Sequence, residues 1–289
     1  MLFYGAARYN SSAAYTMLQS HLMPKSTHQL SHPSFQNNLR IIYWNIRAGG
    51  GRRIDGIYKQ LLAWQPDIIG LSEFRGTPAS QQLAAQLFEA GYPHQITSFL
   101  PSKLVTNALL LASRYPLLRI KSKYMPTLAE RWILAEAKTP MPLTVGLMHV
   151  PNYTKPHLKY PFLESVLKMA SSWRRGPAIL GGDTNCGKRF IDEEKPMAGK
   201  FQKEHDFVVG MEEHGWADAF RHQHGGQREY TWYSHRNNGF RLDYAFLSPA
   251  FASRLTAARH VWGHNPAEPE RREGLSDHAA LILDIFVGR

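Results

Sequence analysis

Cysteine is nearly absent from this sequence of 289 residues, since Cys186 is the only one. A single cysteine excludes an intramolecular disulfide and predicts a reducing, cytoplasmic environment. The chain also lacks an apolar run long enough to cross a membrane and a secretory hydrophobic core. Residues 1–38 contain no acidic residue and little apolar periodicity, which predicts a poorly ordered N-terminal extension. A transit-type peptide has a similar composition, although Arg8 is almost the only arginine there.

Acidic residues are also outnumbered in the chain as a whole. There are 34 lysines and arginines against 23 aspartates and glutamates, a formal net charge of +11. The basic residues are spread through predicted loops, in segments such as RAGGGRR, SSWRRG and HRNNGFR. A positively charged cleft attracts phosphate backbones, whereas many basic proteins bind no nucleic acid. The charge therefore favours DNA as a partner without establishing it.

Apolar periodicity predicts alternating strands and helices after the N-terminal extension. Strands are expected at 41–46, 68–74, 108–112, 133–137, 143–150 and 178–180, and helices at 54–65, 80–90 and 157–173. No internal repeat or linker divides this region. The pattern predicts an α/β sandwich and one catalytic domain over residues 39–289.

Six polar clusters end these apolar runs and carry carboxylates, amides and imidazoles. Each cluster alone is equally explained as a turn, a helix cap or a solvated strand end. Together they predict convergence on a divalent cation and a phosphate, because such groups are costly to bury without partners. The clusters are Asn45 in IIYWNIRAGG, Glu73 in PDIIGLSEF, His149 and Asn152 in LTVGLMHVPN, Asp183 and Asn185 in ILGGDTN, Asp243 in FRLDYAFLS, and Asp277 and His278 in GLSDHAALI.

The order N, E, H, GDxN, RLDY, SDH resembles the endonuclease/exonuclease/phosphatase superfamily, most closely its exonuclease III and abasic-site endonuclease branch. The resemblance runs from about Leu39 to the C-terminus. It implies a four-layer α/β sandwich in which two packed mixed β-sheets are flanked by helices and their strand ends share one cleft. It also implies a monomeric, metal-dependent phosphodiester hydrolase that acts on DNA as an endonuclease or 3′ exonuclease.

The same resemblance implies a magnesium site formed by Asn45, Glu73 and Asp277, in which Mn²⁺ can replace Mg²⁺. Magnesium prefers oxygen ligands and usually takes one or two carboxylates, so this donor set is sufficient. Arg47 stands where abasic-site endonucleases usually have an acidic or amide residue. A cation there would oppose a second metal, which predicts a one-metal site.

The resemblance assigns the catalytic roles to five further residues. Asp183 orients or deprotonates the attacking water, and Asn185 positions the same group. His278 contacts the scissile phosphate, and Asp243 holds its imidazole. His149 stands where abasic-site endonucleases have a tyrosine and pancreatic deoxyribonucleases a histidine.

Residues that would bind substrate are also implied. Asn152 matches a family asparagine and is predicted to bind substrate. The candidates for phosphate contacts are Arg75, Arg131 and Arg241, because arginines suit phosphate oxygens well. Trp232, Phe240 and Leu242 match the residues that form an apolar slot for a base-free sugar, or they fill a core. The glycine turn at 49–51 either presents backbone N–H groups to an anion or only makes a tight turn.

Two other functions stay open at this point. A phosphoesterase of the same fold could act on phosphotyrosyl-DNA, inositol phosphates or phospholipid head groups. The string GGDTN is typical of enzymes that act on phosphotyrosyl-DNA. A catalytically silent binding module is the other alternative. It is disfavoured because the sequence retains every expected metal-binding and water-activating residue.

Overall fold

The computed structural model describes residues 37–196, 201–266 and 272–288. Residues 37–289 form one compact unit. The predicted N-terminal extension, residues 1–38, lies outside the described residues except for its last two positions. Of the helices described, none is long and apolar enough to cross a membrane.

One β-sheet, sheet A, joins strands from both ends of the described chain. Its order, among the described strands, is β13-β14-β1-β2-β4-β3. β1 (Asn38–Asn45) runs parallel to β2 (Ile68–Phe74), and the other neighbours are antiparallel. The remaining strands are β3 (His94–Thr97), β4 (Ala108–Ser113), β13 (Leu255–Val261) and β14 (Ala280–Phe286).

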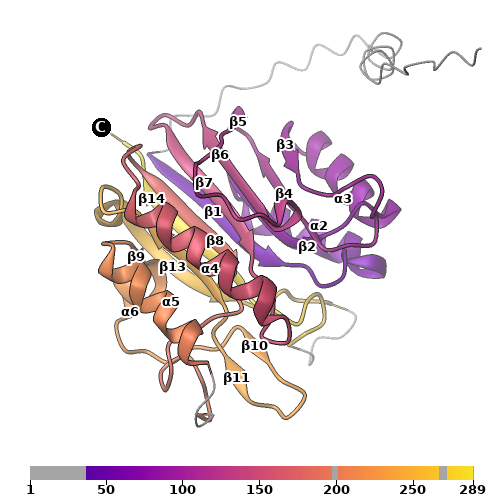
Figure 1. Ribbon diagram of the computed structural model, residues 1–289. Coiled ribbons are helices and arrows are strands. Elements are labelled where there is room, and N and C mark those ends of the chain that lie inside the picture. Colours follow the sequence, from indigo (N-terminus) through magenta and orange to yellow (C-terminus); the bar gives the residue numbers. More distant parts are fainter. Residues whose placement is uncertain (1–36, 197–200, 267–271, 289) are drawn as a thin grey trace, which may run out of the picture. The chain divides into compact units, whose positions relative to one another are not determined.

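The second sheet, sheet B, has the order β5-β6-β7-β8-β12-β9 within the described ranges. β7 (Leu143–His149) and β8 (Ala178–Asp183) are parallel, and the other pairs are antiparallel. A small hairpin of β10 (Trp232–Tyr233) and β11 (Gly239–Phe240) stands apart from both sheets (Figure 1). The remaining strands are β5 (Leu117–Arg119), β6 (Trp132–Ala137), β9 (Ala217–Asp218) and β12 (Asp243–Leu247).

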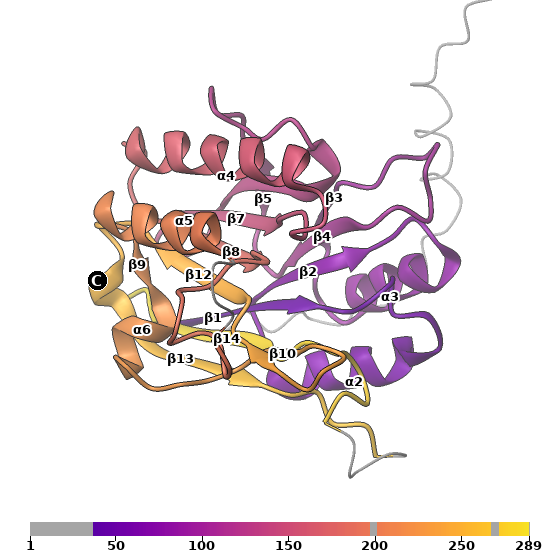
Figure 2. The same cartoon turned by 60° about the horizontal axis from the view of Figure 1, so that its bottom comes forward.

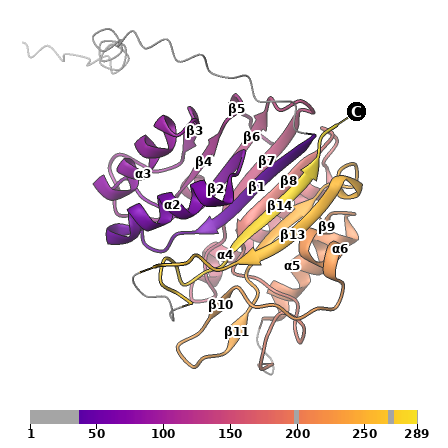
Figure 3. The same cartoon turned by 180° about the vertical axis from the view of Figure 1, so that it is seen from behind.

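Helices cover the outer faces of both sheets. Figure 2 shows α4 (Pro156–Ser171) and α5 (Gln202–Glu213) over sheet B. Figure 3 shows α2 (Ile54–Trp64) and α3 (Pro78–Glu89) over sheet A. The predicted four-layer α/β sandwich is therefore confirmed. Shorter helical segments are α6 (Ala219–His224), η2 (Gly51–Arg53), η3 (Ala129–Arg131) and η4 (Ala252–Arg254).

The apolar strands are buried on both faces, which explains why they are almost continuously hydrophobic. In β1, Ile41 and Tyr43 belong to the core between the two sheets. Ile42 and Trp44 belong to the core between sheet A and helices α2 and α3. Successive side chains of a strand point to opposite faces, so one strand contributes to both layers.

Two glycines allow close packing at the end of β8, one against sheet A and the other against the neighbouring strand β7 of the same sheet. A Cβ at Gly181 would lie 2.5 Å from the Tyr43 ring of β1. Gly182 has φ +129°, and a Cβ there would lie 2.1 Å from the carbonyl oxygen of Met148. Any larger residue would push β8 away from its neighbours. The string GGD therefore sets Asp183 close to the end of β1.

Candidate active site

Strand register alone aligns three of the predicted residues across sheet B. His149 at the end of β7 pairs with Asp183 at the end of the parallel strand β8. Asp243, the first residue of β12, pairs with Asp183 from the other side. The three side chains therefore come from one row of the sheet, and each is at least 96% buried.

Sheet A brings the terminal SDH segment to the same place. β14 begins shortly after His278 and runs antiparallel to β1, so the segment before it lies beside Asn45. The Ser276 hydroxyl donates to the Asn45 carbonyl oxygen at 2.5 Å, and Trp44 Nε1 donates to the His278 carbonyl oxygen at 2.9 Å. Between the sheets, Asn45 Nδ2 donates to Asp183 Oδ2 at 2.9 Å.

His278 forms a buried ion pair with Asp243. Its Nδ1 lies 2.9 Å from Asp243 Oδ2, and its Nε2 lies 3.9 Å from Asp183 Oδ2. Burial alone would lower the pKa of His278, but the charges of Asp243 and Asp183 raise it to about 10. The imidazole is therefore charged at neutral pH. Its two nitrogens are both donors, one held by Asp243 and the other facing Asp183.

His149 has the opposite charge state. Burial, followed by the positive charges of Arg131 and His278, lowers its pKa well below the usual value. Arg131 Nη1 lies 2.9 Å from His149 Nδ1, and an arginine can only donate, so Nδ1 accepts. The ring proton is thus on Nε2, which lies 3.5 Å from Asp183 Oδ2.

Asp183 lies between the two imidazoles at the centre of the site. Burial raises the pKa of Asp183 to about 6, against the lowering effect of the His278 charge. The Asn185 backbone N–H donates to Asp183 Oδ1 at 2.9 Å. The Asn185 amide itself donates to the Val150 carbonyl oxygen at 2.9 Å, so its contacts hold the turn that carries Asp183. Cys186 is buried, and burial raises its pKa to about 12, as expected of a packed turn residue.

Glu73 reaches the site through a β-bulge in β2. The pairing of β2 with β4 shifts between Ser72 and Phe74, and Glu73 between them has φ +58°. A bulge redirects a side chain, and a positive φ outside glycine is a strained conformation typical of functional sites. The Ala48 backbone N–H donates to Glu73 Oε2 at 2.6 Å.

The predicted metal ligands lie around one turn. Arg47 Nε is 3.8 Å from Asp277 Oδ2, and the next residue in the chain binds Glu73. Burial and the charge of Arg47 lower the pKa of Arg53, while Asp277 and Glu73 oppose this shift, so both carboxylates act on one guanidinium. Two half-buried carboxylates suit Mg²⁺, which needs few protein oxygens. Asn45, the third predicted ligand, is already hydrogen-bonded at both ends of its amide. Its Oδ1 accepts from the Arg47 N–H at 2.9 Å, and its Nδ2 donates to Asp183.

A second group of residues has the spacing of metal ligands. Asp183, Asp243 and His278 offer atoms that lie within 4.8 Å of one another. His278 Nδ1 is held by Asp243 Oδ2 at 2.9 Å, and Mg²⁺ prefers oxygen ligands. We therefore interpret this group as an ion-pair network.

Backbone N–H groups of the glycine turn donate to carbonyl oxygens of the protein itself. Residues 47–51 all have positive φ, from 52° to 77°. Gly49 N–H donates to the Glu73 carbonyl oxygen at 2.8 Å, and Gly50 N–H to the Arg47 carbonyl oxygen at 3.1 Å. Arg53 donates to the carbonyl oxygens of Arg47 and Leu275. These contacts favour the tight-turn alternative over an anion site.

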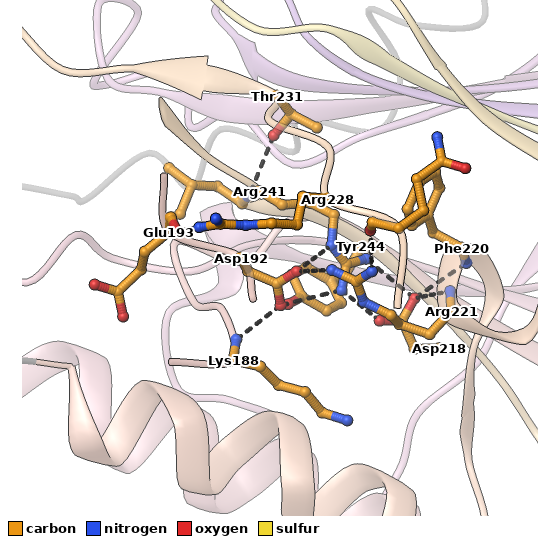
Figure 4. A network of polar contacts seen from close by, with 12 residues as sticks. Lys188, Asp192, Glu193, Asp218, Phe220, Arg221, Arg228, Thr231, Arg241 and Tyr244 are labelled. Carbon is orange, nitrogen blue, oxygen red and sulfur yellow. Dashed lines mark hydrogen bonds and ion pairs between the residues drawn. The ribbon is translucent and has the colours of Figure 1, made fainter. Parts of the chain in front are cut away.

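Arg241 is a correction to the sequence-based prediction. Its side chain is fully buried, and its guanidinium makes two hydrogen bonds to Asp192 and two to Asp218, at 2.6–3.2 Å. Tyr244 and Arg221 bind the same Asp192 carboxylate (Figure 4). Because this guanidinium is buried and already donates to two carboxylates, it is unavailable to a phosphate. The predicted substrate contact of Arg241 is therefore wrong.

The other polar residues predicted to bind substrate have different surroundings. Arg131 contacts His149 at the centre of the site. Arg75 is half-buried, two residues after Glu73, and donates to Asn107 Oδ1 at 2.7 Å. Asn152 is exposed and caps its own turn by accepting from Thr154, so its side chain is not among the groups that meet at Asp183.

In the predicted sugar slot, Trp232 lies beside His278 and packs against Phe240. Trp232 pairs with Phe240 in the hairpin and forms a β-bridge with His278. Phe240 is 8% exposed, with the Trp232 and Phe201 rings each 6.0 Å away. Leu242 and Trp232 are half-buried. Phe240 is thus a buried, packed ring, while Trp232 and Leu242 are partly exposed.

One supporting pair was not foreseen from the sequence. Lys159 and Glu204 are 0% and 3% exposed and form an ion pair of 2.9 Å between α4 and α5. Lys159 Nζ also donates to the Asn185 carbonyl oxygen at 2.7 Å. Lys159 lies three and seven positions before Phe162 and Val166 of the apolar helix face. This spacing could have predicted that Lys159 is buried.

Comparisons with known proteins identify the family and the fold. Residues 42–278 match the Endonuclease/Exonuclease/phosphatase family. No curated protein gives a significant match. The 3′-5′ exonuclease NExo from Neisseria meningitidis has the same fold, with 22% identity and a TM-score of 0.70 over 86% of this chain and 99% of that chain.

Two further solved structures are similar. An AP endonuclease from Archaeoglobus fulgidus has 22% identity and a TM-score of 0.68, over 86% of this chain and 99% of its own. A 3′ phosphatase NExo from Neisseria, bound to a product DNA hairpin, has 22% identity and a TM-score of 0.69 over the same shares of the two chains. At this identity the likeness establishes the fold.

Proposed function

The chain belongs to the endonuclease/exonuclease/phosphatase family, and we propose that it is a metal-dependent phosphodiesterase of the exonuclease III type that acts on DNA 3′ ends. The observation that carries the proposal is the position of Asp183. Its buried carboxylate accepts from Asn45 and lies between a neutral and a charged imidazole. Buried titratable groups with shifted pKa values are typical of catalytic sites, and this set can supply a base and two donors for the hydrolysis of a phosphate ester.

Asp183 is the proposed general base. A base works best when its pKa lies near the working pH, and burial brings that of Asp183 to about 6. The carboxylate is then mostly ionised at neutral pH and can accept a proton from a water molecule. Asn45 and the Asn185 N–H fix its orientation from two sides.

The two histidines have separate roles. His278, charged and held by Asp243, offers Nε2–H to a phosphate oxygen and neutralises part of its negative charge. His149 offers a neutral N–H from the opposite side of Asp183. Glu73 and Asp277 would hold Mg²⁺ or Mn²⁺. When bound, the cation polarises the phosphoryl oxygen and neutralises charge on the leaving oxygen.

A 3′-end substrate is favoured over an abasic site by the packing of the slot. Phe240 is 8% exposed and in contact with Phe201, which leaves little space for a flipped sugar between Trp232 and Phe240. Two of the similar structures are named for activities at 3′ ends. The excess of positive charge favours a nucleic acid as substrate.

A panel of labelled substrates with Mg²⁺ tests the proposal. It contains single-stranded, nicked and abasic DNA, RNA, a 3′-phosphate end, phosphotyrosyl-DNA and inositol phosphates. We expect shortening or dephosphorylation at DNA 3′ ends. We expect Asp183→Asn to lower kcat by about 10²- to 10⁴-fold, because proton transfer by a positioned base contributes that much.

Glu73→Gln should abolish the stimulation by Mg²⁺, and Glu89→Gln, at an exposed carboxylate on α3, is the matched control. Hydrolysis of inositol phosphates or phosphotyrosyl-DNA alone would reject the DNA 3′-end proposal. Full activity of Asp183→Asn would reject the assigned base.

A further inference from the structure

Aromatic rings lead from the candidate active site to the protein surface. Trp232 lies 6.4 Å from the His278 ring, and Phe240 lies 6.0 Å from Trp232. Phe201, directly before α5, is 6.0 Å from Phe240, and Tyr153 is 5.8 Å from Phe201. The outer pair, Tyr153 and Phe201, belongs to none of the roles described above.

Tyr153 is an unusual residue to leave on the surface. Its side chain is 63% exposed, although it is large and aromatic. The Phe201 ring meets it nearly edge to face, with an interplanar angle of 87°, so most of Tyr153 remains open to solvent. It follows Asn152 by one residue and His149 by four, at the exit of β7.

The loop of Tyr153 is held in place before any ligand arrives. Asn152 Oδ1 accepts from both the backbone N–H and the hydroxyl of Thr154, at 3.2 and 2.5 Å. The Lys155 N–H donates to the Asn152 carbonyl oxygen at 3.2 Å. An aromatic side chain on an ordered turn loses little entropy on binding, which is why such residues make effective contacts.

Positively charged residues lie close to this outer pair in the chain. Lys155 is exposed two residues after Tyr153, and Lys203 is exposed two residues after Phe201, with its Nζ 4.2 Å from the centroid of the Tyr160 ring. Gln202, the neighbour of Phe201, accepts from Arg189 Nη1 and donates to Asp206 Oδ1, each at 2.7 Å, so a third cation and one carboxylate bind the same side chain. Exposed rings combined with cations are what proteins use to bind unpaired nucleotides, since every base can stack and every phosphate is an anion.

We propose that Tyr153, supported by Phe201 and flanked by Lys155, Arg189 and Lys203, is a stacking site for a base of an unpaired DNA strand that enters the active site. This inference rests on the proposed function for its substrate. It adds that the substrate strand is unpaired near the cleavage point and that the protein contacts a base there. A fully paired duplex end would not present a base to Tyr153.

Binding to two single strands of equal length tests the stacking site. One strand carries normal bases, and the other consists of base-free tetrahydrofuran units on the same phosphate backbone. Fluorescence anisotropy is measured in EDTA, so that hydrolysis does not consume the probe. We expect tighter binding of the strand with bases.

Tyr153→Ala should weaken binding of that strand by about 5- to 100-fold and leave the base-free strand unchanged, because stacking of one base supplies an effect of this size. Tyr153→Phe should bind like the wild type. Phe88→Ala, at a ring that is 52% exposed at the end of α3, is the control for loss of an exposed aromatic side chain.

Equal weakening on both strands, no weakening, or no preference of the wild type for bases would overturn the stacking site. Failure of the proposed function gives a different result. In that case the substrate panel shows no hydrolysis of DNA, while the base-dependent binding and its loss in Tyr153→Ala remain.

Discussion

The replacement Arg241→Ala distinguishes a structural arginine from a substrate-binding one. The guanidinium makes four hydrogen bonds to Asp192 and Asp218, and all three side chains are at most 2% exposed. Removing one partner of a buried ion pair leaves an uncompensated charge and costs about 3–5 kcal/mol. The variant leaves two carboxylates, Asp192 and Asp218, without the arginine. Since Tyr244 and Arg221 still contact Asp192, we expect the loss for one unpaired carboxylate and not for two.

Urea unfolding measures the loss directly, and thermal unfolding gives a second estimate. For a chain of this size about 1 kcal/mol corresponds to 2–4 °C, so the melting temperature should fall by roughly 6–20 °C. Arg241→Lys retains the charge but loses the forked geometry, and it should lie between the wild type and Arg241→Ala.

Arg75→Ala is the matched control because Arg75 is half-buried and has one side-chain hydrogen bond, to Asn107. Its free energy of unfolding should change by less than about 1 kcal/mol. The reasoning is refuted if Arg241→Ala keeps the stability of the wild type and instead weakens substrate binding. That result would restore the substrate contact expected from the sequence.

Two further predictions concern buried carboxylates. Burial alone would raise the pKa of Asp192, but Arg241 and its other partners lower it to about 2, below the value of about 3.9 in an unfolded chain. Its stabilisation is therefore complete above pH 4, and about 2 kcal/mol is lost as the pH falls from 4 to 2. Urea unfolding at several pH values should show a shallower acid loss for Asp192→Asn, and parallel curves would contradict this. Lys159→Met should cost about 3–5 kcal/mol because it leaves Glu204 buried without a partner, whereas Lys159→Met combined with Glu204→Leu should recover most of the loss in thermal unfolding.

The sequence predicted the strands that form clear apolar runs and the helices that have a clear apolar face. The strand expected at 68–74 is observed as Ile68–Phe74, and the helix expected at 157–173 as Pro156–Ser171. The short strands β3, β5 and β9 were not predicted, and no range was predicted for the later strands β12, β13 and β14. Strands of two to four residues contain too few side chains to establish a period of two, and their pairing partners decide whether they form.

The sequence was less informative about individual side chains of the site. It placed His149, Asp183 and Asp243 at strand ends, and the register of sheet B then brings them together. It predicted one role for Arg241 from the motif RLDY, but the partners that bury this side chain, Asp192 and Asp218, lie 49 and 23 residues away in the chain. Local sequence does not show which carboxylates will reach a given arginine.

The opposite charge states of the two histidines show how such distant partners determine the chemistry of the site. Both imidazoles are buried beside Asp183, yet His278 faces a second carboxylate and His149 faces the Arg131 guanidinium. If His149 were also charged, a further cation would stabilise the ionised form of Asp183 and lower its pKa. A carboxylate with a lower pKa is a weaker base for water. Burial first, and then the charge of Arg131, keep His149 neutral, so in the proposed mechanism the surroundings of His149 help to preserve the base strength that burial gives to Asp183.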